Sequence, residues 1–133
     1  MIPKFRAWDK EEKKMLEVHG INFDANGIWT REMIDDESDG NFLFFDEVKL
    51  MQSTGLKDKN GTEIYEGDIV ELKYPYDKRI KTKGSIVWDR YKSCFGISMK
   101  ETTERYELYR ITAGNYLTVI GNKYQHPELL EDE

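Results

Sequence analysis

Short runs of alternating apolar and polar side chains, separated by turn residues, restrict the fold of this chain more than any other feature. Aromatic residues make up 13% of the sequence and join β-branched residues in runs such as 15–23, 42–52 and 94–100. Runs of this kind predict β-strands, and turn signals at short intervals between them are typical of a sandwich or small barrel. The sequence therefore predicts a mainly β protein.

Glycines mark the expected turns. Asn26-Gly27 is expected to supply the positive-φ residues of a tight hairpin turn. Gly61 and Gly67 are the residues best suited to left-handed backbone conformations in later turns. The segment 67–70 is expected to begin a barrel strand, with the glycine bending the chain and the aspartate capping the turn. A strand that starts in this way is typical of SH3-like barrels.

Helical signals are few. Residues 104–111 fit either helical spacing or an aromatic strand, and both alternatives stay open. Residues 126–130 predict one helical turn, with Pro127 suited to its first position. The chain of 133 residues fits a single domain, 1–133. Within it we expect an N-terminal β-strand extension over 1–48 and an SH3-like or small barrel-like β core over 49–133.

Cysteine content and hydropathy indicate the compartment. Cys94 is the one cysteine, so no intramolecular disulfide can form and a reducing compartment is expected. No apolar run reaches the ~20 residues of a membrane span, and the first residues lack the apolar run of a signal peptide. We expect a cytoplasmic protein that does not contact membranes.

Motifs that carry chemistry are missing from the sequence. It contains neither a phosphate-binding GxxxxGK[ST] loop nor GxGxxG. His19, Cys94 and His126 are isolated, without the paired spacing of zinc ligands. The acidic segment 58–68 offers oxygen ligands near a turn, but its spacing differs from that of an EF-hand. We expect no enzymatic activity, no catalytic residues, no metal and no cofactor.

Charge is unevenly distributed. The net charge of −6 opposes general attraction to nucleic acid. Residues 73–92 nevertheless contain seven basic residues against two acids, whereas 24–47 contain eight acids against one arginine. Either these two segments are ordinary surface loops or they form contact surfaces.

The basic stretch could bind nucleic acid. Lysine and arginine side chains interleaved with aromatic residues can bind phosphate and stack nucleobases. The candidate nucleic-acid or anion contacts are Lys73, Tyr74, Tyr76, Lys78, Arg79, Lys81 and Lys83.

The first fifty residues suggest self-association. Residues 42–45 place apolar side chains on both faces of a predicted strand, which indicates two-sided burial. Exposed strand edges in this part would invite pairing with another chain. We therefore expect a homo-oligomer that packs through residues 1–50, with a self-contained monomer as the alternative.

Three segments carry a resemblance to a known family. They are 4–9 together with Lys14-Met15, then 50–70, and finally 119–130. In order and spacing they resemble the YopX family of phage and prophage proteins from Gram-positive bacteria. The resemblance implies a phage or prophage origin, a mainly β fold and no established enzymatic activity. Residues 71–115 match the family pattern loosely, so features there are expected to be particular to this protein.

These observations lead to three hypotheses of function. The first is an uncharacterised phage or prophage accessory protein that acts as a non-enzymatic binding or regulatory module on an unknown host or phage protein. The alternative is a nucleic-acid-binding protein that uses the basic stretch 73–92. An enzyme is the third and least favoured hypothesis.

Overall fold

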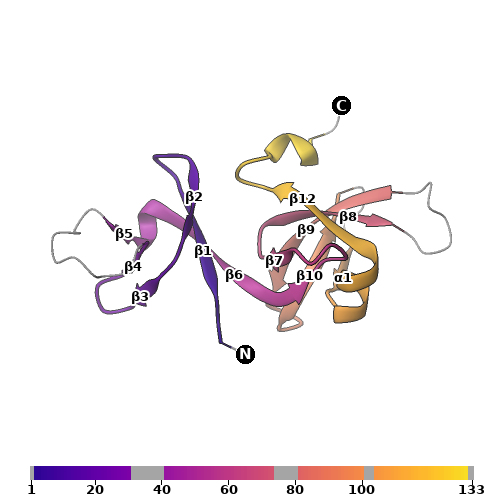
Figure 1. Cartoon of the computed structure of the whole chain (residues 1–133), viewed down its shortest axis with the longest axis horizontal. Coiled ribbons are helices and arrows are strands. Elements are labelled where there is room, and N and C mark those ends of the chain that lie inside the picture. The colour runs from indigo at the N-terminus through magenta and orange to yellow at the C-terminus, as the bar shows by residue number, and fades with distance from the viewer. Residues whose placement is uncertain (1, 31–40, 74–80, 101–103, 132–133) are drawn as a thin grey trace. The chain divides into compact units, whose positions relative to one another are not determined.

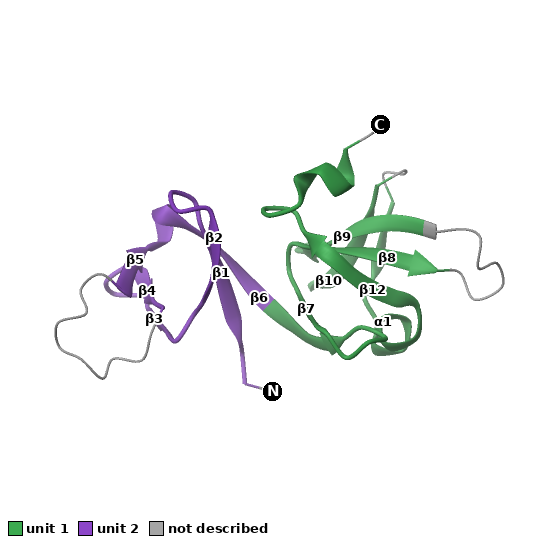
Figure 2. Cartoon of the chain, turned by 45° about the horizontal axis from the view of Figure 1, so that its top comes forward, with its two compact units in different colours: residues 1, 53–133 green, residues 2–52 purple. Residues whose placement is uncertain are grey.

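The computed structural model describes residues 2–30, 41–73, 81–100 and 104–131. The chain divides into two compact units, 2–52 and 53–133, coloured separately in Figure 2. The division falls inside one long strand, β6 (Val48–Lys57), four residues beyond the expected change at 48/49. Both units are built from β-strands, so the prediction of a mainly β fold is confirmed. That the whole chain is a single domain stays a prediction.

The N-terminal unit contains two small antiparallel sheets. In the first, β1 (Phe5–Asp9) lies between β2 (Lys14–Glu17) and the first half of β6, so that Ala7 faces both Leu16 and Leu50. The second has the order β3 (Gly20–Asn22), β4 (Gly27–Trp29) and β5 (Phe42–Phe44) (Figure 1). Ala7, Ile28 and Val48 form the buried centre of this unit.

Two expected strands are interrupted. The run 15–23 forms β2 and β3, and the chain leaves strand geometry between them at Val18 and His19. The run 42–52 is broken by a 3-10 turn, Phe45–Glu47. The Glu47 carboxylate accepts a hydrogen bond from the Phe44 backbone N–H at 2.9 Å. This bond competes with strand pairing and supports the turn, as acidic side chains often do.

The C-terminal unit is a curled, half-open sheet of five antiparallel strands. Their spatial order is β11 (Arg105–Glu107), β10 (Cys94–Met99), β9 (Lys81–Asp89), β8 (Asp68–Lys73) and β12 (Leu117–Asn122). The short helix α1 (Arg110–Tyr116) connects β11 to β12. The strand β7 (Glu63–Tyr65) pairs with the second half of β6. The expected small barrel-like core is thus present in the form of a curled sheet that makes half a barrel.

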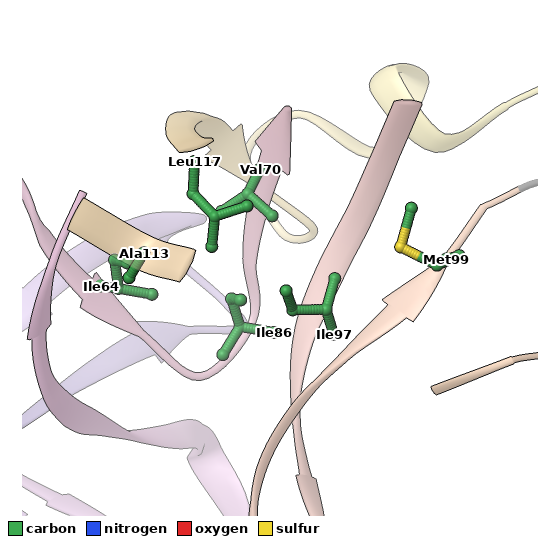
Figure 3. Packing of buried hydrophobic residues seen from close by; sticks show 7 residues of the cluster. All are labelled: Ile64, Val70, Ile86, Ile97, Met99, Ala113 and Leu117. Carbon is green, nitrogen blue, oxygen red and sulfur yellow. The ribbon is translucent and has the colours of Figure 1, made fainter. Parts of the chain in front are cut away.

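Alternation along the strands explains the core of this unit. The register of β9 and β10 places Ile86 directly opposite Ile97. Both side chains point to the same face of the sheet, because paired residues of neighbouring strands share a face. Ala113 of α1 is fully buried in the same cluster, so the helix packs on this face. Figure 3 shows the members of the cluster: Ile64, Val70, Ile86, Ile97, Met99, Ala113 and Leu117.

Several local predictions are confirmed. Gly61 and Gly67 have φ values of +85° and +88°. The Asp68 carboxylate accepts the Tyr65 N–H at 2.7 Å and so caps the turn before β8. The predicted helical turn is the 3-10 segment Pro127–Leu130, with proline in its first turn. Residues 104–111 resolve into both alternatives, since β11 is followed by the start of α1.

One expectation needs correction. Asn26 has a positive φ of 58°, but Gly27 has an extended conformation and begins β4. Elsewhere, Trp88 stands outside the core with 47% of its surface exposed. Its ring packs edge-on against Phe95 at 5.1 Å between centroids. No helix among the described residues is long and apolar enough to cross a membrane.

Candidate binding clefts around helix α1

The predicted basic site is described in part. Lys73 ends β8, Lys83 lies in β9, and both are half-buried. In the register of these strands Lys73 faces Lys81, and Glu71 faces Lys83. Tyr74, Tyr76, Lys78 and Arg79 lie outside the described residues. Lys73 and Lys83 lie on the sheet face opposite the core, and Glu71 lies on the same face.

A cleft lies between the end of β6 and helix α1, and we call it the cationic cleft. Its volume is about 910 Å³. Lys57 and Arg110 stand on opposite walls, and Ile111 is 74% exposed beside them. The full lining is Gly55, Leu56, Lys57, Asp58, Arg110, Ile111, Gly114 and Asn115. Both walls belong to the C-terminal unit, so the cleft is a feature of that unit alone.

The cleft presents cations to a ligand. Lys57 and Arg110 are exposed and have no ion-pair or hydrogen-bond partner among the described residues. The Asp58 carboxylate is buried and engaged by backbone groups. Its Oδ1 accepts the N–H groups of Asn60 and Thr62, and its Oδ2 accepts that of Val119, each at 2.9 Å. The acid therefore serves the turn 58–61 and leaves the two cations facing the cleft.

Gly114 lines the cleft without a packing reason for glycine. A Cβ built on Gly114 meets no atom within 4 Å, and its φ is not positive. Glycine inside a helix nevertheless costs about 1 kcal/mol relative to alanine. Gly114 therefore weakens its helix without relieving a close contact within the chain. A glycine at this position is consistent with close approach by a ligand.

Replacing Gly114 by alanine should therefore stabilise the protein. We expect Gly114→Ala to raise the free energy of unfolding by about 0.5–1 kcal/mol through better helix propensity and a less flexible unfolded chain. Urea denaturation monitored by circular dichroism measures the change. A loss of stability would show that Gly114 has a structural role that the packing does not reveal.

A second, apolar cleft lies on the core-facing side of the sheet, beside the start of α1, and we call it the tyrosine cleft. Its volume is about 350 Å³. Ile97 and Leu72 contribute aliphatic surface, while Tyr106 and Tyr109 are 48% and 61% exposed. The lining residues are Leu72, Ile97, Tyr106, Glu107, Tyr109 and Thr112. Helix α1 thus contributes to both clefts, and Tyr109 before it lines the tyrosine cleft.

An exposed ion pair borders the tyrosine cleft. The Lys92 ammonium lies 3.1 Å from the Glu107 carboxylate. A hydrogen bond and Coulomb attraction from Glu107 raise the pKa of Lys92 above its ordinary value of 10.5. The hydrogen bond from Lys92, with one from its own backbone, lowers the pKa of Glu107 below 4.5. The pair joins the β9–β10 turn to β11.

This pair predicts a small pH dependence of stability. The folded-state pKa of Glu107 is lowered, so its contribution is present above the unfolded pKa and disappears as pH falls through the folded pKa. Because both groups are exposed, the effect should be modest and should weaken with salt. We expect Lys92→Gln to move the Glu107 titration upward in an NMR pH series. An unchanged titration would contradict the pairing.

Most of the other groups that could carry chemistry have structural partners. Among the described residues no three His, Cys, Asp or Glu side chains are placed to hold a metal ion. Asp9 and Asp89 are buried and each accept two backbone N–H groups in a turn. His126 Nδ1 accepts the Asn122 N–H at 3.2 Å, and Cys94 is partly exposed and free of disulfides. The side chains of Asp9, Asp89 and His126 thus hold turns.

Comparison with known proteins decides the family. The family model described as YopX protein matches residues 4–131. The chain belongs to the YopX family. The resemblance noted in the sequence is therefore confirmed, and it covers both compact units of this YopX protein.

Solved structures of two relatives share the fold. The crystal structure of protein EF1440 from Enterococcus faecalis is 32% identical, with a TM-score of 0.73, covering 98% of this chain and 99% of that one. Protein yopX from Bacillus subtilis is 20% identical with a TM-score of 0.61, covering 98% and 97% of the respective chains, and shows likeness of fold alone. No curated protein matches the chain.

Proposed function

We propose that this YopX protein is a non-enzymatic binding or regulatory module of phage or prophage origin that engages a host or phage protein in the bacterial cytoplasm. The observation that carries the proposal is the exposed apolar surface at α1. Tyr109 and Ile111 expose 61% and 74% of their surface, and a cleft lies on each side of the helix. Apolar groups beside concave surfaces mark interaction sites.

The helix supports these side chains firmly. Ala113 is fully buried in the core cluster of the half-barrel and anchors α1. Tyrosine is enriched at the energetic centres of protein interfaces, because it combines a large apolar area with a polar tip. A fixed helix that exposes a tyrosine and an isoleucine is suited to binding a protein partner. Binding of this kind requires no catalytic residue.

Affinity capture with matched variants tests this proposal. Tagged wild-type protein and the double variant Tyr109→Ser, Ile111→Ser would be expressed in infected or lysogenic bacterial cells. We expect a reproducible partner with wild type and at least about a tenfold loss with the double variant, the usual effect of removing an interface hot spot. Quantitative mass spectrometry provides the measurement.

Tyr91→Ser is the matched control. Tyr91 is 82% exposed in the same unit but lies in the β9–β10 turn, and it lines neither cleft. It should leave capture unchanged. A partner set that is the same for wild type, control and double variant would refute the assignment to α1. Genes of replication, packaging or recombination next to this one would support the phage origin.

Nucleic-acid binding is the second candidate. Lys73 of β8 and Lys83 of β9 lie on one sheet face in neighbouring antiparallel strands. A phosphate bound on this face could contact both lysines. We expect this candidate to give binding to labelled DNA or RNA at low salt that weakens steeply with salt and with Lys73→Gln, Lys83→Gln. Absence of binding to single- and double-stranded probes would eliminate it.

Self-association through residues 1–50 is part of the proposal. Phe23 and Phe44 expose 77% and 52% of their surface in the N-terminal unit. Burial of such rings between subunits would be favourable. Light scattering coupled to size-exclusion chromatography should give an oligomeric mass for wild type and a monomeric mass for Phe23→Ser, Phe44→Ser. A monomeric wild type at high concentration would overturn this part.

A further inference from the structure

The cationic cleft combines three features on one small surface. It has two cations, Lys57 and Arg110, without partners among the described residues. It has an apolar side chain, Ile111, that is 74% exposed. It also has a helical glycine, Gly114, with open space where a side chain would stand. Each feature is unfavourable or neutral for the isolated chain, and each would be used by a ligand with acidic and apolar groups.

The cations define the chemical class of the ligand. An arginine guanidinium recognises carboxylate or phosphate through two parallel hydrogen bonds, and lysine adds a mobile point charge. Because the Asp58 oxygens are occupied by three backbone N–H groups, no lining carboxylate competes through a hydrogen bond for these cations. The cleft is therefore prepared for an anion with at least two negative groups.

A peptide fits these features better than nucleic acid does. Nucleic-acid affinity comes from neutralising many phosphates, on the order of six to ten in well-studied complexes. This cleft offers two cations on a chain of net charge −6. An acidic peptide can place two carboxylates on Lys57 and Arg110 and an apolar side chain against Ile111. The open surface at Gly114 lets its backbone approach closely.

We propose that the cationic cleft binds a short, extended acidic segment of a protein partner, with an apolar residue between its carboxylates. This assignment rests on the proposed function and names the kind of partner that α1 recognises. The Arg110 guanidinium holds one carboxylate, Lys57 holds the other, and the backbone of the segment passes over Gly114. Ile111 and Leu56 supply the apolar contact.

The test uses a fluorescein-labelled peptide of alternating glutamate and leucine and measures anisotropy with the full-length protein. We expect saturable binding that weakens with salt. Arg110→Gln and Lys57→Gln should each weaken binding by about tenfold or more, as expected for loss of a charge-assisted hydrogen bond. Gly114→Gln should abolish binding by filling the cleft while keeping the helix stable.

Matched controls separate the cleft from general charge. Lys59→Gln removes an exposed cation two residues from Lys57 that does not line the cleft, and it should leave affinity unchanged. A peptide with glutamine in place of glutamate should not bind. Equal loss with Lys59→Gln and Lys57→Gln would overturn the proposal, because attraction would then be unspecific. Lack of saturable binding of the acidic peptide to wild type would also overturn it.

Two further outcomes distinguish this inference from the proposed function. If a single-stranded DNA probe binds more tightly than the peptide and responds to Arg110→Gln, the cleft recognises nucleic acid and the peptide assignment fails. If the peptide does not bind but capture of a cellular partner is lost with Tyr109→Ser, Ile111→Ser, the binding function stands and the acidic-segment assignment alone falls.

Discussion

The variant Asp58→Ala should lose about 3 kcal/mol of folding free energy, because it leaves three backbone donors without their charged acceptor. The Asp58 side chain is 5% exposed. It holds Asn60 and Thr62 in the turn through Oδ1, and it reaches Val119 of β12 through Oδ2. Val119 is 61 residues away along the chain, so the same carboxylate fixes a local turn and a distant strand.

Two variants calibrate this prediction. Asp58→Asn keeps one acceptor oxygen for the turn but turns its amide donor toward the Val119 N–H, so an intermediate loss is expected. Asp24→Ala removes an exposed aspartate and should change stability by less than about 0.5 kcal/mol. Urea denaturation provides all three values. If Asp58→Ala unfolds at the same midpoint as Asp24→Ala, the three hydrogen bonds contribute nothing net.

Asp58 also shows which features a local sequence pattern can predict and which it cannot. The turn at 58–61 follows from the sequence, because the aspartate and the glycine have well-understood local roles. The bond to Val119 does not follow, since no local pattern connects positions so distant. The same holds for the half-barrel. Alternation predicts its strands, but their spatial order, β11-β10-β9-β8-β12, depends on long-range pairing.

The clefts at α1 do not follow from the sequence in the way that the fold does. Charge counting directs attention to residues 73–83, because clustered lysines stand out in any sequence, and that site stays a prediction. The clefts at α1 depend on a helix whose start, at Arg110, lay in a segment that fitted both helix and strand. Lys57 and Arg110 are brought together by folding alone. The available local signal was Gly114 between Ala113 and Asn115, a glycine within the helix.

Gly27→Ala should be the second large effect and should destabilise the N-terminal unit by about 3 kcal/mol through overpacking. The Asn26-Gly27 pattern predicts a positive-φ turn at Gly27, but the residue is extended and paired with Phe44. A Cβ at this position would lie 2.4 Å from Cζ of Phe42 and 2.5 Å from the Leu43 carbonyl oxygen. The carbonyl belongs to the pairing strand β5, so it cannot move without breaking the sheet.

Gly20→Ala offers a matched control in the neighbouring strand. A Cβ on Gly20 approaches a single ring carbon of Trp29 within 3.4 Å, Cε3 at 3.1 Å, and a partly buried ring can shift by the few tenths of an ångström required. The loss should therefore be smaller than that for Gly27→Ala. Hydrogen exchange should show lost protection first in β4 and β5. Equal losses for the two variants would mean that chain flexibility, and not close approach of β5, explains the glycine at position 27.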